Sequence, residues 1–321
     1  MIHNFMKKIA ILGAGGFVGR SLCEYFRTLS GSYDVVGVRR SDFSLLDGDA
    51  VASFIEREKP DVVINCASEG GARKTGYGDG GGVVENNLRM FFNVERALPD
   101  ETLYIFFGSG AQYEKTRDLV KVRETSLGER IPADPYGFSK YVLAKYVENG
   151  GRKMTLYPTI FGLFGPNEDY TYKFISNACV KNMLGMDIRI NQNVRFDYLY
   201  VDDFCAIIAA LIENGEPRHR VFNITPTQSV TLTELAEAVN RAGTGKSAIS
   251  VANGGMNFEY TGCNRRLFEN LGREYRFLPY EESVARLYKA LEKNLANLDT
   301  DAVRADDAIK HCKTRETPEK T

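Results

Sequence analysis

The chain has 321 residues, 43% hydrophobic and 26% charged, a length and composition typical of a folded protein of one or two domains. Lys and Arg number 41 and Asp and Glu 42, so the formal net charge of −1 gives no overall attraction to nucleic acid or an anionic membrane, and neither is expected as a partner. The longest uninterrupted apolar stretch, Phe204 to Ile212, is half the roughly 18 residues that a membrane span requires.

Cysteine and histidine usage gives no sign of a metal site or of disulfides. The six cysteines are scattered and form no Cys-x-x-Cys pair: Cys23, Cys66, Cys179, Cys205, Cys263 and Cys312. The three histidines are equally dispersed, which also argues against a Ser-His-Asp triad. Lys7-Lys8 and the following apolar run lack a signal-peptide cleavage site. We therefore expect no metal, reduced thiols and a cytoplasmic location.

The first half of the sequence predicts repeated βαβ units. Short β-branched or apolar runs alternate with segments of helical periodicity, at residues 7–12, 34–38, 61–66, 102–107 and 153–157. Runs such as Val62-Val63-Ile64 are continuously apolar, as in a parallel sheet that is covered by helices on both faces. The expected fold class is α/β, a doubly wound parallel sheet (Rossmann) with a smaller C-terminal domain.

The second half predicts that smaller domain. Helical patterns cover residues 172–183 and 202–214, and a strand at 221–224 precedes a helix with Thr231 as N-cap and Glu234 as its capping-box partner. The expected domains are residues 1–165, with 197–224 returning to them, and then 166–196 together with 225–297. We expect the glycine-rich segment 76–82 to be a mobile loop and the charged segment 298–321 to be a disordered tail.

A glycine turn directly follows the first predicted strand. Gly13, Gly16 and Gly19 recur at every third position, and Phe17-Val18 opens a helix. Such a turn brings the backbone and the helix N-terminus close to a pyrophosphate. An ordinary glycine-rich loop is the alternative, but the position between strand and helix favours dinucleotide binding.

The end of the second predicted strand bears on the choice of dinucleotide. An NAD site usually places an acidic residue about 20 positions after the turn, but this chain has Arg39-Arg40 there. Two guanidinium groups suit a 2′-phosphate, so the sequence favours NADP(H) over NAD(H). Two solvated arginines are the alternative.

A Tyr-x-x-x-Lys pair begins a later helix. Asp134 is the expected N-cap and Pro135 the first helical residue, so Tyr136 and Lys140 lie one turn apart on the same face. A nearby ammonium favours the phenolate and brings the phenol into the working range of an acid/base group. Ser109 ends the fourth predicted strand, at the edge where doubly wound sheets bind ligands.

Together these motifs resemble the extended short-chain dehydrogenase/reductase family, in its nucleotide-sugar epimerase/dehydratase/reductase branch. The resemblance covers roughly residues 7–296 and is greatest to the GDP-L-fucose synthase and dTDP-4-dehydrorhamnose reductase types. Further matches are Tyr113, Asn65-Cys66-Ala67, Asn87, Phe164-Gly165-Pro166, Asp197-Tyr198 with Asp202-Asp203, and Phe222-Asn223-Ile224.

The resemblance implies a role for each of these residues. Tyr136 is the general acid/base, Lys140 lowers its pKa and holds the nicotinamide ribose, and Ser109 bonds the reacting oxygen. Asp42-Phe43 resembles the pair with which related reductases hold adenine, although it could equally be a turn. Cofactor contacts are expected from Gly13, Gly16, Phe17, Val18, Gly19, Arg39, Arg40, Asp42, Phe43, Ala67, Asn87, Tyr136 and Lys140.

Within the family, the sequence favours 4-keto reduction. Dehydratases carry an acidic pair beside the strand-end Ser or Thr, whereas this chain has Gly110-Ala111-Gln112. The Cys and His with which GDP-L-fucose synthase epimerises correspond to Ala111 and Lys173. We therefore expect an NADPH-dependent reductase of a nucleotide-linked 4-keto-6-deoxy hexose. The alternatives are an NAD-retaining 4-epimerase and a non-catalytic regulator that senses the cofactor.

Two cations are candidates for the diphosphate of a nucleotide-sugar substrate. Lys173 follows the switch between the predicted domains, and Arg195 lies one position before the site where relatives carry a phosphate-directed arginine, here Phe196. A surface lysine and a solvated strand arginine are the alternatives. The family also implies a homodimer, formed through the helices that contain Asn87 and Tyr136.

Overall fold

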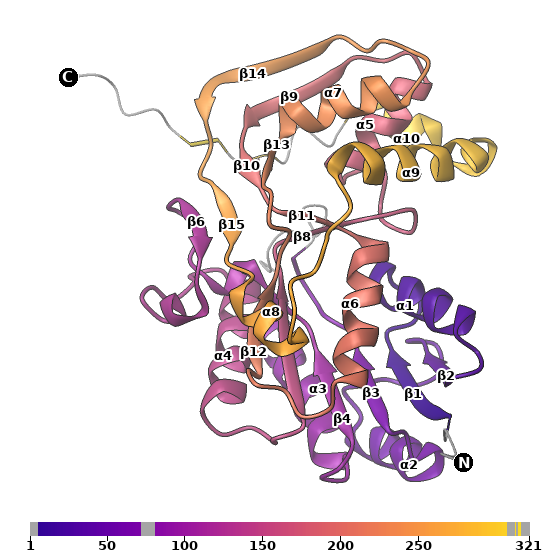
Figure 1. Cartoon of the computed structure of the whole chain (residues 1–321), viewed down its shortest axis with the longest axis vertical. Coiled ribbons are helices and arrows are strands. Elements are labelled where there is room, and N and C mark those ends of the chain that lie inside the picture. The colour runs from indigo at the N-terminus through magenta and orange to yellow at the C-terminus, as the bar shows by residue number, and fades with distance from the viewer. Residues whose placement is uncertain (1–5, 72–80, 307–311, 313, 316–321) are drawn as a thin grey trace.

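The computed structural model describes residues 6–71, 81–306, 312 and 314–315. One parallel sheet forms the lower half of Figure 1, with strand order β12-β7-β4-β3-β1-β2 and β5 added beside β7. Its strands are β1 (Lys7–Leu12), β2 (Tyr33–Val38), β3 (Val62–Asn65), β4 (Leu103–Phe106), β5 (Gly108–Ser109), β7 (Thr155–Ile160) and β12 (Val221–Ile224). The predicted doubly wound α/β fold is confirmed.

Helices cover both faces of this sheet. On one face lie α1 (Phe17–Thr28) and α6 (Val201–Glu213), and on the other lie α2 (Gly48–Glu58), α3 (Val83–Ala97) and α4 (Pro135–Asn149). Side chains of β1 alternate between the two cores, because successive residues of a strand point to opposite faces. Ile9 and Ile11 join the α1 and α6 side, and Ala10 and Leu12 join the other.

The upper half of Figure 1 contains short strands and the helices α5, α7 and α9. The remaining helices of the chain are α5 (Phe174–Met183), α7 (Leu232–Ala242), α8 (Arg265–Leu271), α9 (Tyr280–Lys293) and α10 (Thr300–Arg304), with 3-10 turns η2 (Gly110–Gln112), η3 (Glu124–Ser126) and η4 (Leu295–Asn297); α8 lies in the lower half. The strands are β6 (Leu119–Val122), β8 (Gly162–Phe164), β9 (Ile188–Asn193), β10 (Arg195–Phe196), β11 (Tyr198–Tyr200), β13 (Val230–Thr231), β14 (Ile249–Met256) and β15 (Tyr260–Gly262). The predicted capping box of Thr231 and Glu234 begins α7.

Two elements cross the domain boundaries that the sequence predicts. β6, from the first segment, pairs with β15 in the four-stranded sheet β13-β10-β15-β6. Helix α8, expected in the second domain, packs against the main sheet, where Arg266 donates to the Val221 carbonyl oxygen over 3.0 Å. Both contacts join segments far apart in sequence, which local patterns do not reveal.

The predicted disordered tail is wrong for its first residues. Asp299 caps α10, and Val303 of that helix is fully buried. Farther along, the Arg315 backbone N–H donates to Gln192 Oε1 over 2.8 Å. One small apolar residue suffices to dock a short helix on a larger core, so low hydrophobicity alone does not predict disorder here. Residues 307–311, 313 and 316–321 lie outside the described residues, as do residues 76–80 of the predicted mobile loop.

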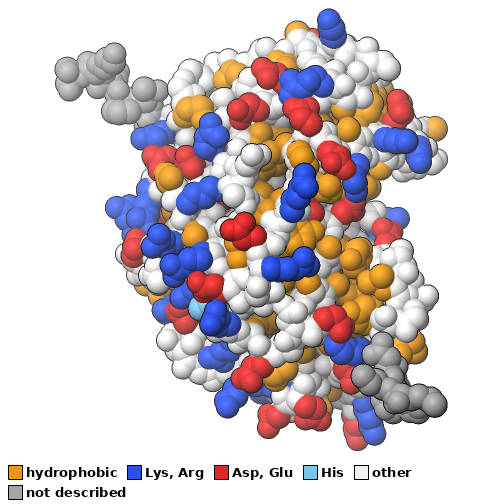
Figure 2. All heavy atoms as spheres, in the orientation of Figure 1, with side chains coloured by type: hydrophobic (Ala, Val, Ile, Leu, Met, Phe, Trp, Pro, Cys, Tyr) orange, Lys and Arg blue, Asp and Glu red, His pale blue; other side chains and the backbone are white. Residues whose placement is uncertain are grey.

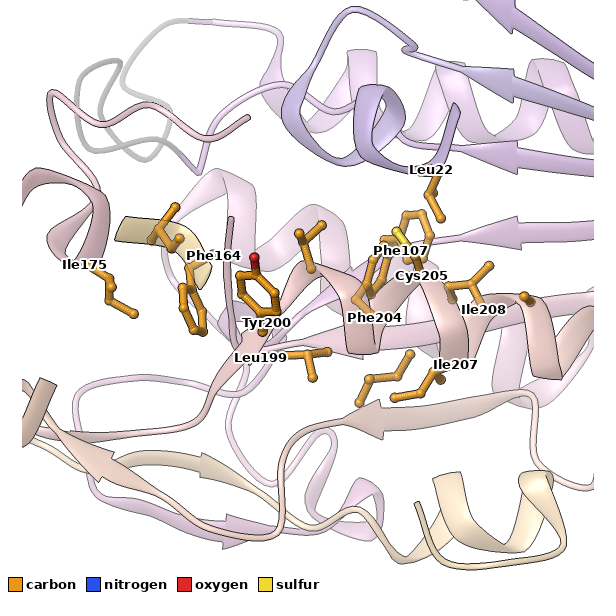
Figure 3. Close-up of a cluster of buried hydrophobic side chains, with 14 of the residues drawn as sticks. Leu22, Phe107, Phe164, Ile175, Leu199, Tyr200, Phe204, Cys205, Ile207 and Ile208 are labelled. Carbon is orange, nitrogen blue, oxygen red and sulfur yellow. The ribbon is translucent and has the colours of Figure 1, made fainter. Parts of the chain in front are cut away.

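A continuous apolar core ties the two halves together around α6. Figure 3 shows Phe107, at the end of β4, beside Phe204 of α6, with their ring centres 5.2 Å apart. The same core extends through Leu199 and Phe164 to Ile175 of α5. The end of β4, which leads into Ser109, is therefore supported by tightly packed side chains.

The face of the molecule drawn in Figure 2 carries no large patch of a single charge. Figure 2 shows Lys and Arg side chains interspersed with Asp and Glu, as the balanced composition implies. Within the described residues, no helix combines the length and apolarity needed to cross a membrane.

Candidate active site

The glycine turn after β1 is held in a conformation that needs glycine. Gly13 has φ +80°, and its N–H and that of Ala14 both donate to the carbonyl oxygen of Val38 over 2.9 Å. A Cβ at Gly19 would lie 2.3 Å from the Gly13 carbonyl oxygen, so α1 packs too closely on the turn for any side chain there. The end of β1 and the start of α1 are thus fixed beside the end of β2.

The N-terminus of α1 fits a bound pyrophosphate. Gly16 is the N-cap, no side chain caps the helix, and its first turn contains no acidic residue. The first N–H groups of the helix, at Phe17 and Val18, therefore keep their donor capacity and positive dipole end. Gly16 is exposed, and a Cβ there would come no nearer than 3.6 Å to its neighbours. An anionic group can approach this backbone closely.

Ala67 lies against the same turn. Its backbone N–H donates a hydrogen bond to Asn65 Oδ1 over 3.0 Å and is therefore already used within the protein. A Cβ at Gly13 would lie 2.9 Å from the Ala67 nitrogen, so the end of β3 and the turn are in contact. Gly13 and Ala67, the predicted cofactor residues that follow β1 and β3, therefore lie side by side.

The residues after β2 divide into two groups. Arg39 and Arg40 are exposed, and neither side chain forms an ion pair or hydrogen bond with any described residue. Arg39 Cγ would be 3.9 Å from a Cβ at Gly15, so its stem reaches over the glycine turn. In contrast, the Asp42 carboxylate accepts from the Arg39 backbone N–H over 2.7 Å, and the Phe43 ring packs 5.3 Å from Phe54.

Asp42 and Phe43 therefore have the structural roles that the sequence left open. Asp42 closes the turn after β2, since its own N–H also donates to the Arg39 carbonyl oxygen over 3.0 Å. Phe43 belongs to the core on the α2 side of the sheet. Contact between this pair and adenine stays a prediction.

Lys140 is buried beside Tyr136. Its Nζ donates to the Phe107 carbonyl oxygen over 2.9 Å and lies 5.6 Å from the centre of the Tyr136 ring. The side chain is only 3% exposed, and burial lowers the pKa of Lys140 to about 7. A lysine poised at neutral pH next to a phenol is suited to proton chemistry.

The first turn of α4 brings Tyr136 to Ser109. As predicted, Asp134 caps the helix by accepting from the Gly137 N–H over 2.8 Å. A Cβ at Gly137 would lie 2.6 Å from the Ala111 carbonyl oxygen, so α4 touches η2 without an intervening side chain. Ser109 is the N-cap of η2, so the first turn of α4, which contains Tyr136, lies against the turn that Ser109 begins at the end of the sheet.

Asn87, a predicted cofactor residue, is held by hydrogen bonds within the protein. Its side chain is fully buried, Oδ1 accepts from the Glu69 N–H over 2.8 Å, and Nδ2 donates to the Glu69 carbonyl oxygen and to Ser139 Oγ, each over 3.0 Å. Its hydrogen-bonding capacity is thus used within the protein. Asn87 fixes the loop after β3 to α4, and contact between Asn87 and the cofactor stays a prediction.

The two candidate substrate cations lie on other elements, Lys173 at the start of α5 and Arg195 on β10. Exposed Lys173 is the N-cap residue of α5, where burial raises the pKa of Glu168 to about 8 and the Lys173 charge partly offsets that rise. Arg195 pairs with Thr231 across β10 and β13, and its charge acts on Glu234 at the start of α7. No hydrogen bond or ion pair between described residues joins either cation to Ser109 or Lys140.

Sequence reasoning missed an aromatic cluster beside Ser109. Phe196 stacks on Tyr198 with ring centres 4.5 Å apart, and Tyr260 lies 4.7 Å from Phe196 and 4.9 Å from Phe161. The Tyr260 hydroxyl would be 2.4 Å from a Cβ at Gly110, which allows the cluster to reach the residue after Ser109. These rings come from three segments far apart in the sequence, around residues 161, 196–198 and 260, so local spacing does not reveal the cluster.

An ion pair between half-exposed Lys121 and buried Asp197 supports the same region and was also missed. Lys121 Nζ lies 3.1 Å from Asp197 Oδ1, and Asp197 is 1% exposed. Burial raises the pKa of Asp197, while Lys121 and a hydrogen bond from the Gly262 N–H oppose that rise. The family match at Asp197 was the only available signal, and it did not identify the partner 76 positions away.

Comparison with known proteins identifies the family. A sequence profile described as the NAD dependent epimerase/dehydratase family matches residues 9–225, more than half of the chain. The chain belongs to this family. The matched range contains the glycine turn, Ser109, Tyr136 and Lys140, which agrees with the resemblance seen in the sequence.

Individual relatives within the NAD dependent epimerase/dehydratase family are distant. A dTDP-4-dehydrorhamnose reductase from Aggregatibacter actinomycetemcomitans is 38% identical over 63 residues, 20% of this chain and only 21% of the relative's length. A GDP-L-fucose synthase from Escherichia coli is 22% identical over 73% of this chain and 80% of its own. The structure of a GDP-mannoheptose C4 reductase from Campylobacter jejuni, with NADP bound, is similar with a TM-score of 0.73, 18% identity, and coverage of 89% of this chain and 98% of that one.

Proposed function

We propose that this protein reduces the 4-keto group of a nucleotide-linked 6-deoxy hexose, or of a closely related keto sugar, with NADPH. The observation that carries the proposal is the buried Lys140 beside Tyr136, at the strand end that holds Ser109. This arrangement supplies a proton donor, a charge that stabilises its anion, and a hydroxyl for the reacting oxygen.

The residues around Ser109 disfavour other family chemistries. Ala111 and Gln112 follow Ser109 at the positions where dehydratases carry their acidic pair, and neither is a carboxylate. Both are buried, at 2% and 0% exposed. Ala111 and Lys173 likewise replace the cysteine and histidine of an epimerising synthase. Reduction requires neither pair, and the residues that it does require are present.

Each residue has a defined task in the proposed reaction. Bound NADPH supplies the hydride that is added to the carbonyl carbon. Tyr136 donates its proton to the carbonyl oxygen, which becomes the 4-hydroxyl, and solvent then returns a proton to Tyr136. Ser109 donates a hydrogen bond to that oxygen, and the Lys140 ammonium stabilises the transient phenolate.

In the proposed enzyme, the cofactor and the sugar substrate bind to different parts of the fold. Residues 1–165 with 197–224 hold NADP(H), and residues 166–196 with 225–297 hold the nucleotide diphosphate sugar. The protein acts in the cytoplasm as a homodimer formed through α3 and α4, where Phe138 of α4 is 37% exposed. These assignments rest on the position of the glycine turn and on the family.

The proposed reduction is tested by incubating purified protein with NADPH and GDP-, CDP-, dTDP- and UDP-linked 4-keto sugars, and following the loss of NADPH absorbance. Oxidation of NADPH with one of these sugars, and no oxidation without sugar, is the expected result. An NAD-retaining 4-epimerase would instead purify with bound NAD and would consume no NADPH.

Removing both arginines after β2 should change the choice of cofactor. Arg39→Ala with Arg40→Ala is expected to weaken NADPH binding by about ten- to 150-fold per charge-assisted bond lost, because such bonds contribute roughly 1.5 to 3 kcal/mol. NADH binding should change little. Fluorescence titration of both cofactors measures this, with Arg57→Ala and Arg89→Ala as a control of equal charge on exposed helix surfaces. Equal losses for the two cofactors would refute a 2′-phosphate role.

Truncating the candidate phosphate cations should affect substrate binding alone. Lys173→Ala is expected to raise KM for the nucleotide sugar with little change in kcat or in KM for NADPH, because remote phosphates bind alike in ground and transition states. Arg195→Ala should do so less, since its charge already acts on Glu234. Steady-state kinetics against the exposed-site variant Lys246→Ala provide the measurement.

Unchanged substrate KM in both variants would remove these two cations from the site. The next candidates, Arg265 and Arg266, are already paired with Glu269 and Glu124. Arg73 and Lys74, also considered from the sequence, lie outside the described residues.

A further inference from the structure

Two glycines of the loop after β3 lie directly against Tyr136. Gly70 and Gly71 have φ values of +77° and +79°, a conformation that side-chain-bearing residues rarely adopt. A Cβ at Gly71 would lie 2.7 Å from Tyr136 Cζ, the carbon that carries the hydroxyl, and 2.9 and 3.0 Å from the two flanking ring carbons. Real Cβ contacts are not this short, so the phenol ring could not stay in place beneath a larger residue.

Gly70 contacts the other end of the same side chain. A Cβ there would lie 3.2 Å from Val83 Cγ1, 3.3 Å from Tyr136 Cβ and 3.4 Å from Tyr136 Cδ2. These distances are tight, but they require the neighbouring atoms to shift by only a few tenths of an ångström. The two glycines therefore share the same backbone conformation and differ in which part of Tyr136 they contact.

Hydrogen bonds fix this loop to the helix that contains Tyr136. Glu69, the residue before the glycines, is held at both its N–H and its carbonyl oxygen by Asn87, and its carboxylate accepts from Asn86 Nδ2 over 2.8 Å. Asn87 also donates to Ser139 Oγ, which in turn donates to the Tyr136 carbonyl oxygen over 2.8 Å. The residue that directly precedes the two glycines is thus connected by hydrogen bonds to the helix that contains Tyr136.

We propose that Gly71 is a positioning residue for Tyr136, holding the phenol plane by backbone contact so that its hydroxyl stays aligned with Ser109 and Lys140. The inference rests on the proposed reduction for its kinetic consequence, but the contact itself does not depend on the identity of the substrate. Only glycine satisfies both demands at position 71, because the backbone has a positive φ and the ring leaves no room for a Cβ.

The test compares Gly71→Ala with Gly70→Ala. Both variants place a methyl group on a backbone of the same conformation, so both should lose thermal stability to a similar degree. Gly71→Ala alone should displace the phenol, and a misplacement of about 1 Å can lower kcat by about 10²-fold. Affinity for NADPH, measured by fluorescence, should be little changed in either variant. Equal kcat values in the two variants would overturn the proposal.

A double-mutant cycle separates positioning from general damage. If Gly71 acts through the Tyr136 hydroxyl, Gly71→Ala should cost little further activity in the Tyr136→Phe background, because the group that it misplaces is already absent. A full additional 10²-fold loss in that background would contradict a role through Tyr136.

A chemical readout keeps the inference testable if no 4-keto sugar is reduced. Nitration of Tyr136 by tetranitromethane, quantified by peptide mass spectrometry, requires no substrate. Gly71→Ala should increase nitration at Tyr136 over both the unmodified protein and Gly70→Ala, because the ring is pushed out from beneath the loop. Identical nitration in all three proteins would refute the positioning role, whereas failure of the proposed reaction alone would leave the difference in nitration intact.

Discussion

Tyr136→Phe is expected to lower kcat by about 10²- to 10⁴-fold, the range typical of general acid catalysis. The substitution removes only the proton donor, and the remaining ring still fits beneath Gly70 and Gly71. The carbonyl oxygen would then take its proton from water, which is neither positioned by the protein nor stabilised after proton loss by Lys140. Single-turnover measurements with NADPH and the 4-keto sugar substrate give the rate of the reduction step.

The control for Tyr136→Phe lies one turn farther along α4. Tyr141 is partly buried on the same helix but lies beside Gly128 and Phe138, away from Ser109. Tyr141→Phe should keep its activity, and both variants should bind NADPH as the unmodified protein does. A Tyr136→Phe protein with most of its activity would remove Tyr136 from the mechanism.

Lys140→Met should abolish turnover while making the protein more stable at neutral pH. Methionine has a similar length but no charge, so the phenolate of Tyr136 loses its stabilising ammonium. Stability should rise because the structure now keeps Lys140 in a site that disfavours its charge: burial lowers its pKa from 10.5 to about 7. The hydrogen bond to the Phe107 carbonyl oxygen is lost, but a buried charge is the more costly feature.

The pH dependence of that stability difference has a definite sign. Between pH 7 and 10.5 the unfolded chain binds one more proton at Lys140 than the folded chain, so the stability of the unmodified protein rises with pH across this interval. The advantage of Lys140→Met should therefore be greatest at or below pH 7 and should disappear toward pH 10.5. Melting temperatures of both proteins over this range provide the measurement, and an advantage that grows with pH would contradict it.

The same ionisation should limit catalysis. In the unmodified protein kcat/KM for reduction should fall as pH rises through about 7, because Lys140 then loses the charge that stabilises the phenolate. A rate independent of pH around 7 would show that Lys140 keeps its proton during turnover.

The features that sequence predicted well are those set by neighbouring residues. The turn at Gly13 and Gly19, and the start of α4 at Asp134, each follow from steric or hydrogen-bonding demands within a few positions. Spacing alone also placed Tyr136 and Lys140 on one face of a helix, where the structure has them.

The features that sequence missed depend on contacts between distant segments. Nothing local shows that Asn87 holds Glu69 and Ser139, because these residues lie 18 and 52 positions away in the sequence. Similarly, Lys121 meets Asp197 only because β6 pairs with β15 across the second sheet. Gly71 was missed because its contact joins the loop after β3 to Tyr136 of α4 and involves no side chain of its own.

The most direct measurement of the proposed reaction uses NADPH that carries deuterium at the transferred position of its nicotinamide ring. The deuterium is expected to appear at C4 of the product sugar, with one equivalent of NADP⁺ formed for each sugar reduced and an unlabelled product when unlabelled NADPH is used. A product that contains no deuterium, formed while the added NADPH remains unoxidised, would contradict reduction and indicate an isomerisation that uses retained NAD.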